Sequence, residues 1–248
     1  IEASCRKPSC LHPKTCRHLS LDMAPLVRLM RAVREAPGVR KAFVASGVRM
    51  DVACHSPAYL RELATGHVGG QLSVAPEHVS GRVLALMRKH GVADTERFME
   101  MFAKASRKAD KEQFLVPYLM SGHPGCDLGD MIEAALWLER HGLRPRQVQE
   151  FVPIAMTLAT AMYWTGMDPY TMKPVHVARD PHEKMMQKAM LLCWDPANQS
   201  LAREALIRAG RRDLIGRGPG CLVPPEGKGA PRSGRPVSRP RRPRTSRA

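Results

Sequence analysis

The feature that most constrains the fold of this chain is a regular alternation of strand-like and helical segments between residues 22 and 155. Short runs rich in apolar, β-branched and aromatic residues occur at 39–45, 71–75, 113–120 and 147–152. Between them lie segments whose apolar residues recur at helical spacing. Strands joined by helical crossovers of this length pair in parallel, so the pattern predicts an α/β fold of about four β/α units.

The predicted strands are continuous apolar runs rather than alternating ones. Phe43-Val44 and Phe114-Leu115-Val116 are examples. Parallel strands with both faces covered have this composition, so we expect helices on both faces of the sheet. Four such units fit either part of a barrel or part of an open doubly wound sheet, and periodicity alone does not separate these two.

Helical segments fill the intervals between the strands. Leu26, Leu29, Met30 and Val33 have the spacing of the apolar stripe of an amphipathic helix. Further helices are predicted at 57–66, around 83–87, from a cap at Asp94 or Thr95, and at 128–141. Residues 182–194 and 197–209 predict a helical pair appended to the α/β unit.

The formal net charge of +16 is concentrated near one end of the chain. Residues 217–248 contain nine Lys and Arg against one acidic residue, which is half of the excess charge. A Pro/Gly/Arg-rich segment with few apolar residues buries too little surface to become ordered, so 217–248 are predicted to be a disordered basic tail. A solvated extension is the simplest meaning of such a tail, and a weak contact with nucleic acid is the alternative.

The seven cysteines and the absence of an export signal favour a reducing, cytoplasmic environment. No apolar run reaches the length of a membrane span, so no membrane partner is expected. The first residue is Ile1, and we interpret the chain as a fragment of a longer protein.

Three of the cysteines lie within the first 21 residues, which we treat as a separate loop. Cys5, Cys10 and Cys16 are close enough in sequence to bind zinc or an iron–sulfur cluster through three thiolates. A fourth ligand would come from His12, His18, Cys54 or a segment outside this chain. The alternative is three reduced thiols in a loop that covers the α/β unit.

Polar or turn-forming residues follow each predicted strand. They are Ser46 after the first strand, Pro76, Glu77 and His78 after the second, Ser121 and His123 after the third, and Pro153 after the fourth. The carboxyl ends of parallel strands converge on one side, where ligands bind in such folds. Taken singly, each of these positions is also explained as a turn or a solvated polar residue.

Ten short stretches of the sequence together resemble one family. They are 46–51, 67–70, 75–78, 83–89, 117–118, 121–125, 147–151, 162–166, 195–198 and 214–216. In this order, and across roughly residues 1 to 225, they resemble radical S-adenosylmethionine proteins of the YgiQ type. The set is specific, whereas any single stretch is weak.

The resemblance implies an incomplete (β/α)6 radical S-adenosylmethionine barrel. This chain would hold about the last four β/α units at 22–165, with a C-terminal helical region at 166–216 beside them. In that family a CxxxCxxC loop binds a [4Fe-4S] cluster, and S-adenosylmethionine binds the open iron site. An electron donor reduces the cluster, and the resulting 5′-deoxyadenosyl radical abstracts hydrogen from the substrate.

This chain contains no CxxxCxxC sequence. We therefore expect the cluster ligands upstream of Ile1, and the fragment to be inactive alone. The resemblance implies that Glu77 or His78, in the turn with Pro76, meets the ribose of this small-molecule cofactor. It places Ser121 and His123 near the adenosine and Ser46 near the methionine end.

The substrate is not identified by any of these features. The alternative function is a non-catalytic α/β protein that binds nucleic acid through its basic tail or is stabilised by zinc.

Overall fold

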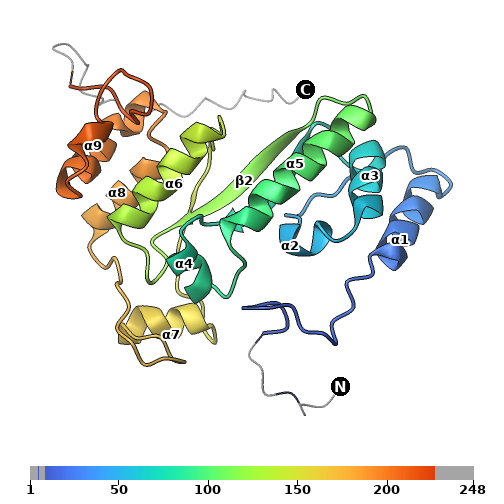
Figure 1. Ribbon diagram of the computed structural model, residues 1–248, viewed down its shortest axis with the longest axis horizontal. Helices are drawn as coiled ribbons and strands as arrows, with labels where there is room; N and C mark the ends of the chain where they lie inside the picture. Colours follow the sequence, from blue (N-terminus) through green and yellow to red (C-terminus); the bar gives the residue numbers. More distant parts are fainter. Residues whose placement is uncertain (1–4, 6–8, 227–248) are drawn as a thin grey trace, which may run out of the picture.

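A small, open, parallel sheet of three strands in the order β1-β2-β3 crosses the middle of the molecule (Figure 1). The strands are β1 (Gln71–Glu77), β2 (Phe114–Ser121) and β3 (Gln149–Glu150). The computed structural model describes residue 5 and residues 9–226. The predicted α/β class with parallel strands is confirmed.

Helices precede, connect and follow these strands. Those before and between the first two strands are α1 (Ala24–Glu35), α2 (Met50–Ala53), α3 (Pro57–Gly66), α4 (Gly81–Leu86) and α5 (Val92–Lys108). Those that follow are α6 (Leu128–Arg140), α7 (Leu158–Thr165), α8 (Pro181–Leu191) and α9 (Gln199–Arg208). The predicted cap of α5 is wrong, because Gly91 is the N-cap and Asp94 lies in the first turn.

The pairing of β2 is extensive on one side and short on the other. Its register with β1 runs from Gln71 opposite Phe114 to Glu77 opposite Leu119, with a bulge before Glu77. On the other side only Met120 and Ser121 pair with β3. The predicted strand 147–152 is therefore shortened to two residues. Prolines at 145 and 153 flank it, and proline cannot donate to a strand ladder.

The first predicted strand, 39–45, is not a strand in the structure. Val44 N–H donates to the His67 carbonyl (3.0 Å), and further on Val48 forms an isolated bridge with Val74. Single hydrogen bonds of this kind do not make a ladder. Phe43 is 54% exposed, because no described layer covers this segment.

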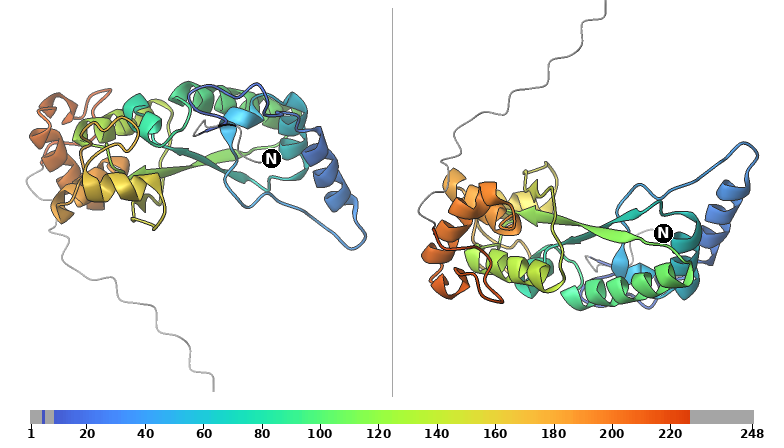
Figure 2. Two further views of the ribbon diagram at one scale, coloured as in Figure 1. Left: turned by 90° about the horizontal axis from the view of Figure 1, so that it is seen from below. Right: turned by 90° about the horizontal axis from the view of Figure 1, so that it is seen from above.

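The two faces of β1 and β2 have different surroundings. Leu72, Val74 and Leu119 are buried beneath helices, and α5 and α6 lie along the same side of the sheet (Figure 2). Phe114, Val116 and Tyr118 point to the opposite face and are exposed. The expectation that both faces are covered is therefore wrong, since the described helices cover one face.

Helix α1 also buries a different set of residues from the one its stripe predicts. Val27 and Met30 are buried, whereas Leu26, Leu29 and Val33 are exposed. Two ion pairs fix this orientation, because Arg31 and Arg34 both bind the buried carboxylate of Glu62 on α3, at 2.6 and 2.8 Å. These charged contacts are long-range in sequence, so apolar spacing does not report them.

The helical pair near the C-terminus is confirmed as α8 and α9, which share a second hydrophobic core with α6. Part of the predicted disordered tail belongs to this core. Leu222 and Val223 are buried, and Gly216 N–H donates to the Val223 carbonyl (2.9 Å). The tail prediction is thus wrong for 217–226, and residues 227–248 lie outside the described residues.

Among the described helices, none is both long and apolar enough to cross a bilayer.

Candidate functional site

An open pocket of about 490 Å³ lies at the carboxyl ends of the three strands, and we call it the strand-end pocket. Its polar lining residues come from the last residue of β1, from the turns after α4 and β2, and from β2 and β3. Its apolar wall comes largely from the segment that leads into α7. The lining includes Glu77, Arg88, Lys89, Tyr118, Met120, His123, Glu150, Phe151, Val152, Ile154 and Leu158.

Glu77 is held in an unusual conformation at the end of β1. Its φ of 65° lies in the left-handed region, which non-glycine residues rarely adopt. Its Oε1 lies 3.2 Å from Nζ of Lys89, which also donates to the Ala75 carbonyl (2.8 Å). Its Oε2 is buried and has no hydrogen-bond partner among the described residues. The carboxylate is therefore anchored on one oxygen and unsatisfied on the other.

Arg88 repeats this pattern in the turn that follows α4. Its φ is 55°, and its buried Nε has no partner within the described part of the chain. The guanidinium lies 3.3 Å from Oδ1 of Asp168 and 4.6 Å from the centre of the Tyr170 ring. Strained backbone and unsatisfied buried polar atoms cluster at functional sites, and here both occur twice in one pocket lining.

His123 lies in the turn after β2. Its Nδ1 is 2.7 Å from the Pro124 carbonyl, and its ring meets the Phe151 ring edge-on at 5.5 Å. Burial lowers the pKa of His123 to about 4, so the imidazole is neutral at pH 7. Gly122 and Gly125 take positive φ in this turn. A Cβ at Gly125 would lie 2.0 Å from Leu86 Cδ1, so the close approach requires glycine.

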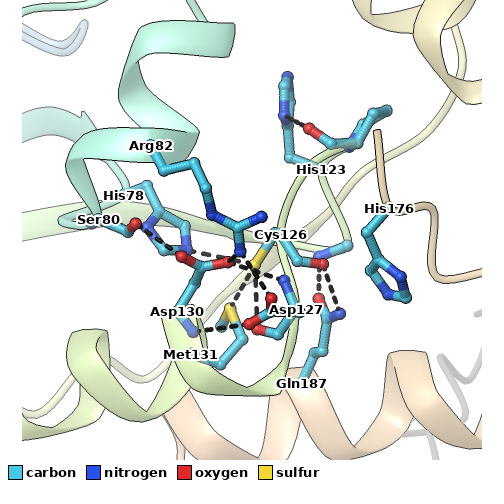
Figure 3. Close-up of polar contacts among 12 residues, drawn as sticks. His78, Ser80, Arg82, His123, Cys126, Asp127, Asp130, Met131, His176 and Gln187 are labelled. Atoms are coloured by element: carbon cyan, nitrogen blue, oxygen red, sulfur yellow. Dashed lines mark hydrogen bonds and ion pairs between the residues drawn. The ribbon is translucent and has the colours of Figure 1, made fainter. Parts of the chain in front are cut away.

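His78 belongs to a buried cluster rather than to the strand-end pocket (Figure 3). Its Nδ1 accepts from the Ser80 N–H (3.0 Å), so Nε2 carries the proton and donates toward Sγ of Cys126 (3.4 Å). Ser80 Oγ donates to Asp130 (2.7 Å), which also accepts from Arg82.

The electrostatics of this cluster favour neutral groups. Burial, together with His123 and Arg82, lowers the pKa of His78 to about 4. Burial and the nearby carboxylates of Asp130 and Asp127 raise the pKa of the Cys126 thiol well above its usual value. A neutral imidazole beside a protonated thiol is not an activated nucleophile, so the cluster acts as a structural support for the turn after β2.

The structure brings together two of the six residues expected to bind the cofactor, Glu77 and His123. Pro76 lines a smaller neighbouring pocket with Gly47, Lys89 and His90. Ser46 is exposed in the loop before α2. Ser121 is buried, and its Oγ donates weakly to the Gln149 carbonyl (3.4 Å). These three positions and His78 therefore do not line the strand-end pocket.

Sequence reasoning missed several residues of the pocket. Lys89 belongs only to a family stretch (83–89), and Tyr118 belongs to a predicted strand and to a family stretch (117–118), but neither is predicted as a site residue. Strand alternation gives a signal for Tyr118, because Phe114, Val116 and Tyr118 share one face. No local signal marks Lys89, since its contact with Glu77 depends on the path of the chain through α4.

None of the three N-terminal cysteines lines this pocket. Cys5 and Cys10 are exposed and Cys16 is partly exposed, and Cys16 N–H donates to the Cys10 carbonyl (2.7 Å). Within residue 5 and residues 9–226, no three His, Cys, Asp or Glu side chains are arranged to hold a metal ion. Residues 6–8 lie outside the described part, so the metal site stays a prediction.

One family model and several UPF0313 proteins are similar to this chain. Residues 146–248 match a family described as a domain of unknown function, DUF3362. A UPF0313 protein of Methanosarcina acetivorans is 49% identical over 90% of this chain and 30% of the relative. UPF0313 proteins of Geobacter sulfurreducens and Pseudomonas aeruginosa are 49% and 46% identical, over 38% and 31% of their lengths.

The chain thus spans about a third of the length of the curated relatives it matches. Their names state no activity and no cofactor. Close homologues of this chain are therefore UPF0313 proteins. UPF0313 is the YgiQ family, which the sequence resembles.

Proposed function

We propose that this chain is part of a radical S-adenosylmethionine enzyme and that the strand-end pocket binds part of S-adenosylmethionine. The homology to UPF0313 proteins supports the family. The position of the pocket at the carboxyl ends of parallel strands supports a ligand site. Under this proposal the [4Fe-4S] ligands lie in another part of the full-length protein, an electron donor reduces the cluster, and the substrate is unknown.

The observation that carries the proposal is the half-satisfied carboxylate of Glu77. A buried polar atom without a partner destabilises a protein unless a ligand supplies the missing hydrogen bond. Oε2 of Glu77 is a hydrogen-bond acceptor on a residue that lines the strand-end pocket, so it suits a ligand that presents hydroxyl donors, such as a ribose. Lys89 binds the other oxygen and thereby fixes the direction in which Oε2 points.

The remaining lining residues divide into two roles. Tyr118, Met120 and Phe151 offer flat or apolar surface that suits a purine ring. His123 is neutral at pH 7, so it does not repel the sulfonium charge of the cofactor. When bound, S-adenosylmethionine and a reduced cluster supply the radical chemistry. The residues of this chain orient the cofactor.

The test is a calorimetric titration of this chain with S-adenosylmethionine. Glu77→Gln keeps the size of the side chain and removes its charge. Because a hydrogen bond to a charged group contributes about 1.5–3 kcal/mol, we expect affinity to fall by roughly tenfold or more.

The matched control is Glu112→Gln, an exposed carboxylate beside the start of β2, at the opposite end of the strands. This change should leave the affinity within about twofold of the original value. Folded chain that shows no saturable binding, or equal affinity for the Glu77→Gln variant, contradicts the proposal.

A further inference from the structure

The turn after β2 is held in place by a helix that comes more than 50 residues later in the sequence. Gln187 lies in α8 and is fully buried. Its Oε1 accepts from the Gly122 N–H (2.9 Å), and its Nε2 donates to the Cys126 carbonyl (3.0 Å). Figure 3 shows the Gln187 amide directed at the turn that carries His123 and Cys126.

A second contact comes from the segment that leads into α8. Gly125 N–H donates to the His176 carbonyl (2.7 Å). The ring of His176 in turn lies 2.7 Å from the Glu183 carboxylate. The turn is therefore anchored through three backbone groups, at Gly122, Gly125 and Cys126, with His123 between the first two.

The same C-terminal region also holds the other strained turn of the pocket. Asp168 accepts a hydrogen bond from the Arg88 guanidinium (3.3 Å), and the Tyr170 ring lies against the same guanidinium. Asp168 is itself fixed by the Tyr170 N–H (3.1 Å) and the Thr171 hydroxyl (2.8 Å). Both turns that carry polar residues of the strand-end pocket thus depend on residues 168–187.

We infer that residues 166–191, within the segment that matches the domain of unknown function, act as a clamp that positions the strand-end pocket, with Gln187 as the positioning residue. The inference rests on the proposed function only for the identity of the ligand. Gln187 is suited to this role because one amide both accepts from Gly122 and donates to Cys126. An apolar side chain of equal length would fill the same space but would leave both backbone groups buried and unpaired.

The test compares two substitutions at Gln187 with a control in the same hydrophobic core. Gln187→Met removes both hydrogen bonds at nearly constant volume. Gln187→Glu keeps the acceptor for Gly122 and loses the donor to Cys126. Leu206→Ala, in α9, opens a cavity in the core that α8 and α9 share and removes no contact to the turn.

Two measurements are made on the full chain. The first is the NMR titration of the His123 ring, assigned with a His123→Gln variant, and the signal of the neighbouring His78 is followed at the same time. The second is the affinity for S-adenosylmethionine. A side chain that only stabilises the fold would change neither measurement beyond what Leu206→Ala changes.

We expect Gln187→Met to raise the pKa of His123 from about 4 toward its ordinary value, because a loosened turn admits water. We expect it to weaken binding of S-adenosylmethionine by about tenfold or more. For Gln187→Glu, the pKa of His123 and the affinity for S-adenosylmethionine should both lie between the values for Gln187→Met and for the unchanged protein. Leu206→Ala should lower the midpoint of unfolding but leave the His123 titration and the affinity for S-adenosylmethionine unchanged.

An unchanged His123 titration in Gln187→Met overturns the clamp, and so does an equal change in Leu206→Ala. If Gln187→Met does not fold, Gln187→Glu is judged by the same two criteria. Failure of the unchanged chain to bind S-adenosylmethionine contradicts the proposed function alone. In that case the His123 titration still decides whether the clamp exists.

Discussion

The two faces of the β1–β2 sheet are formed by the same strands but differ in their exposure: one is covered by helices and the other is open. On the covered face Leu72 and Leu119 are at most 1% exposed and meet helices. On the open face Phe114 is 57% exposed and Tyr118 is 45% exposed. The strand-end pocket lies where Tyr118 and Met120, on the open side, meet the end of β1 and the turn after α4.

This difference separates the residues that hold the fold from those available to a ligand. Side chains alternate along a strand, so neighbouring residues of β2 serve opposite purposes. Substitutions on the covered face should therefore change stability, and substitutions on the open face should change binding.

The largest expected effect is a difference between two phenylalanines. Phe98 of α5 is fully buried against the covered face and stacks on Phe102 with ring centres 5.9 Å apart. Phe98→Ala should lower the free energy of unfolding by about 3–5 kcal/mol, because it leaves a cavity. Phe114→Ala, on the open face, should change it by less than about 1 kcal/mol. Urea unfolding of both variants measures this, and equal losses would show that the open face is also part of the core.

A smaller effect is expected from acid, which charges the two buried histidines beside the turn after β2. Burial lowers the pKa values of His78 and His123 to about 4, so the folded protein binds these protons less well than the unfolded chain. The stability from the neutral rings is complete above about pH 6.5 and is lost as the pH falls through 6.5 toward 4. The upper limit is roughly 3 kcal/mol for each ring.

The measurement is the urea midpoint between pH 7 and pH 4.5 for the unchanged chain and two variants. His78→Gln should flatten the dependence on pH, because it removes one of the two buried rings. His55→Gln, at an exposed position, should leave the dependence as it was. A slope that does not respond to His78→Gln would mean that other groups cause the loss of stability in acid.

The elements on the covered face are those that the sequence predicts well. The helical spacing around Tyr59, Leu60 and Leu63 and the apolar run of β2 identify α3 and β2, because the burial pattern of each is local. Whether a second layer covers a strand is not a local property. The apolar composition of Phe114 and Val116 therefore indicates burial on both faces, although the described structure covers one.

The candidate site also depends in part on contacts that are not local in sequence and that the sequence therefore does not predict. Glu77 and His123 are predictable because ligands gather where parallel strands end. His78 follows Glu77 directly and Ser121 lies two residues before His123. Their side chains nevertheless turn into the protein and bind Ser80 and the Gln149 carbonyl. Gln187 is 65 residues from Gly122, and nothing in its own neighbourhood marks its role.

The smallest expected effect on stability concerns the cysteine thiols, some of which are buried and some exposed. Cys126 and Cys193 are buried, and burial raises the pKa of Cys193 to about 11. Only a thiolate attacks a thiol reagent at an appreciable rate, so these two should react only after unfolding. Cys5 and Cys10 are exposed and should react in the folded chain unless a metal ion holds them.

Because three thiolates that are close in sequence can bind zinc or an iron–sulfur cluster, we expect Cys5, Cys10 and Cys16 to be protected together in metal-loaded chain. Removal of the metal with a chelator should expose all three at once, and metal analysis should give about one zinc or one cluster per chain. The free energy of unfolding should change by less than about 1 kcal/mol on metal removal, because the three cysteines are so close in sequence that the unfolded chain can also bind the metal. Three thiols that react independently, in chain that contains neither zinc nor iron, would show instead that this loop carries ordinary reduced cysteines.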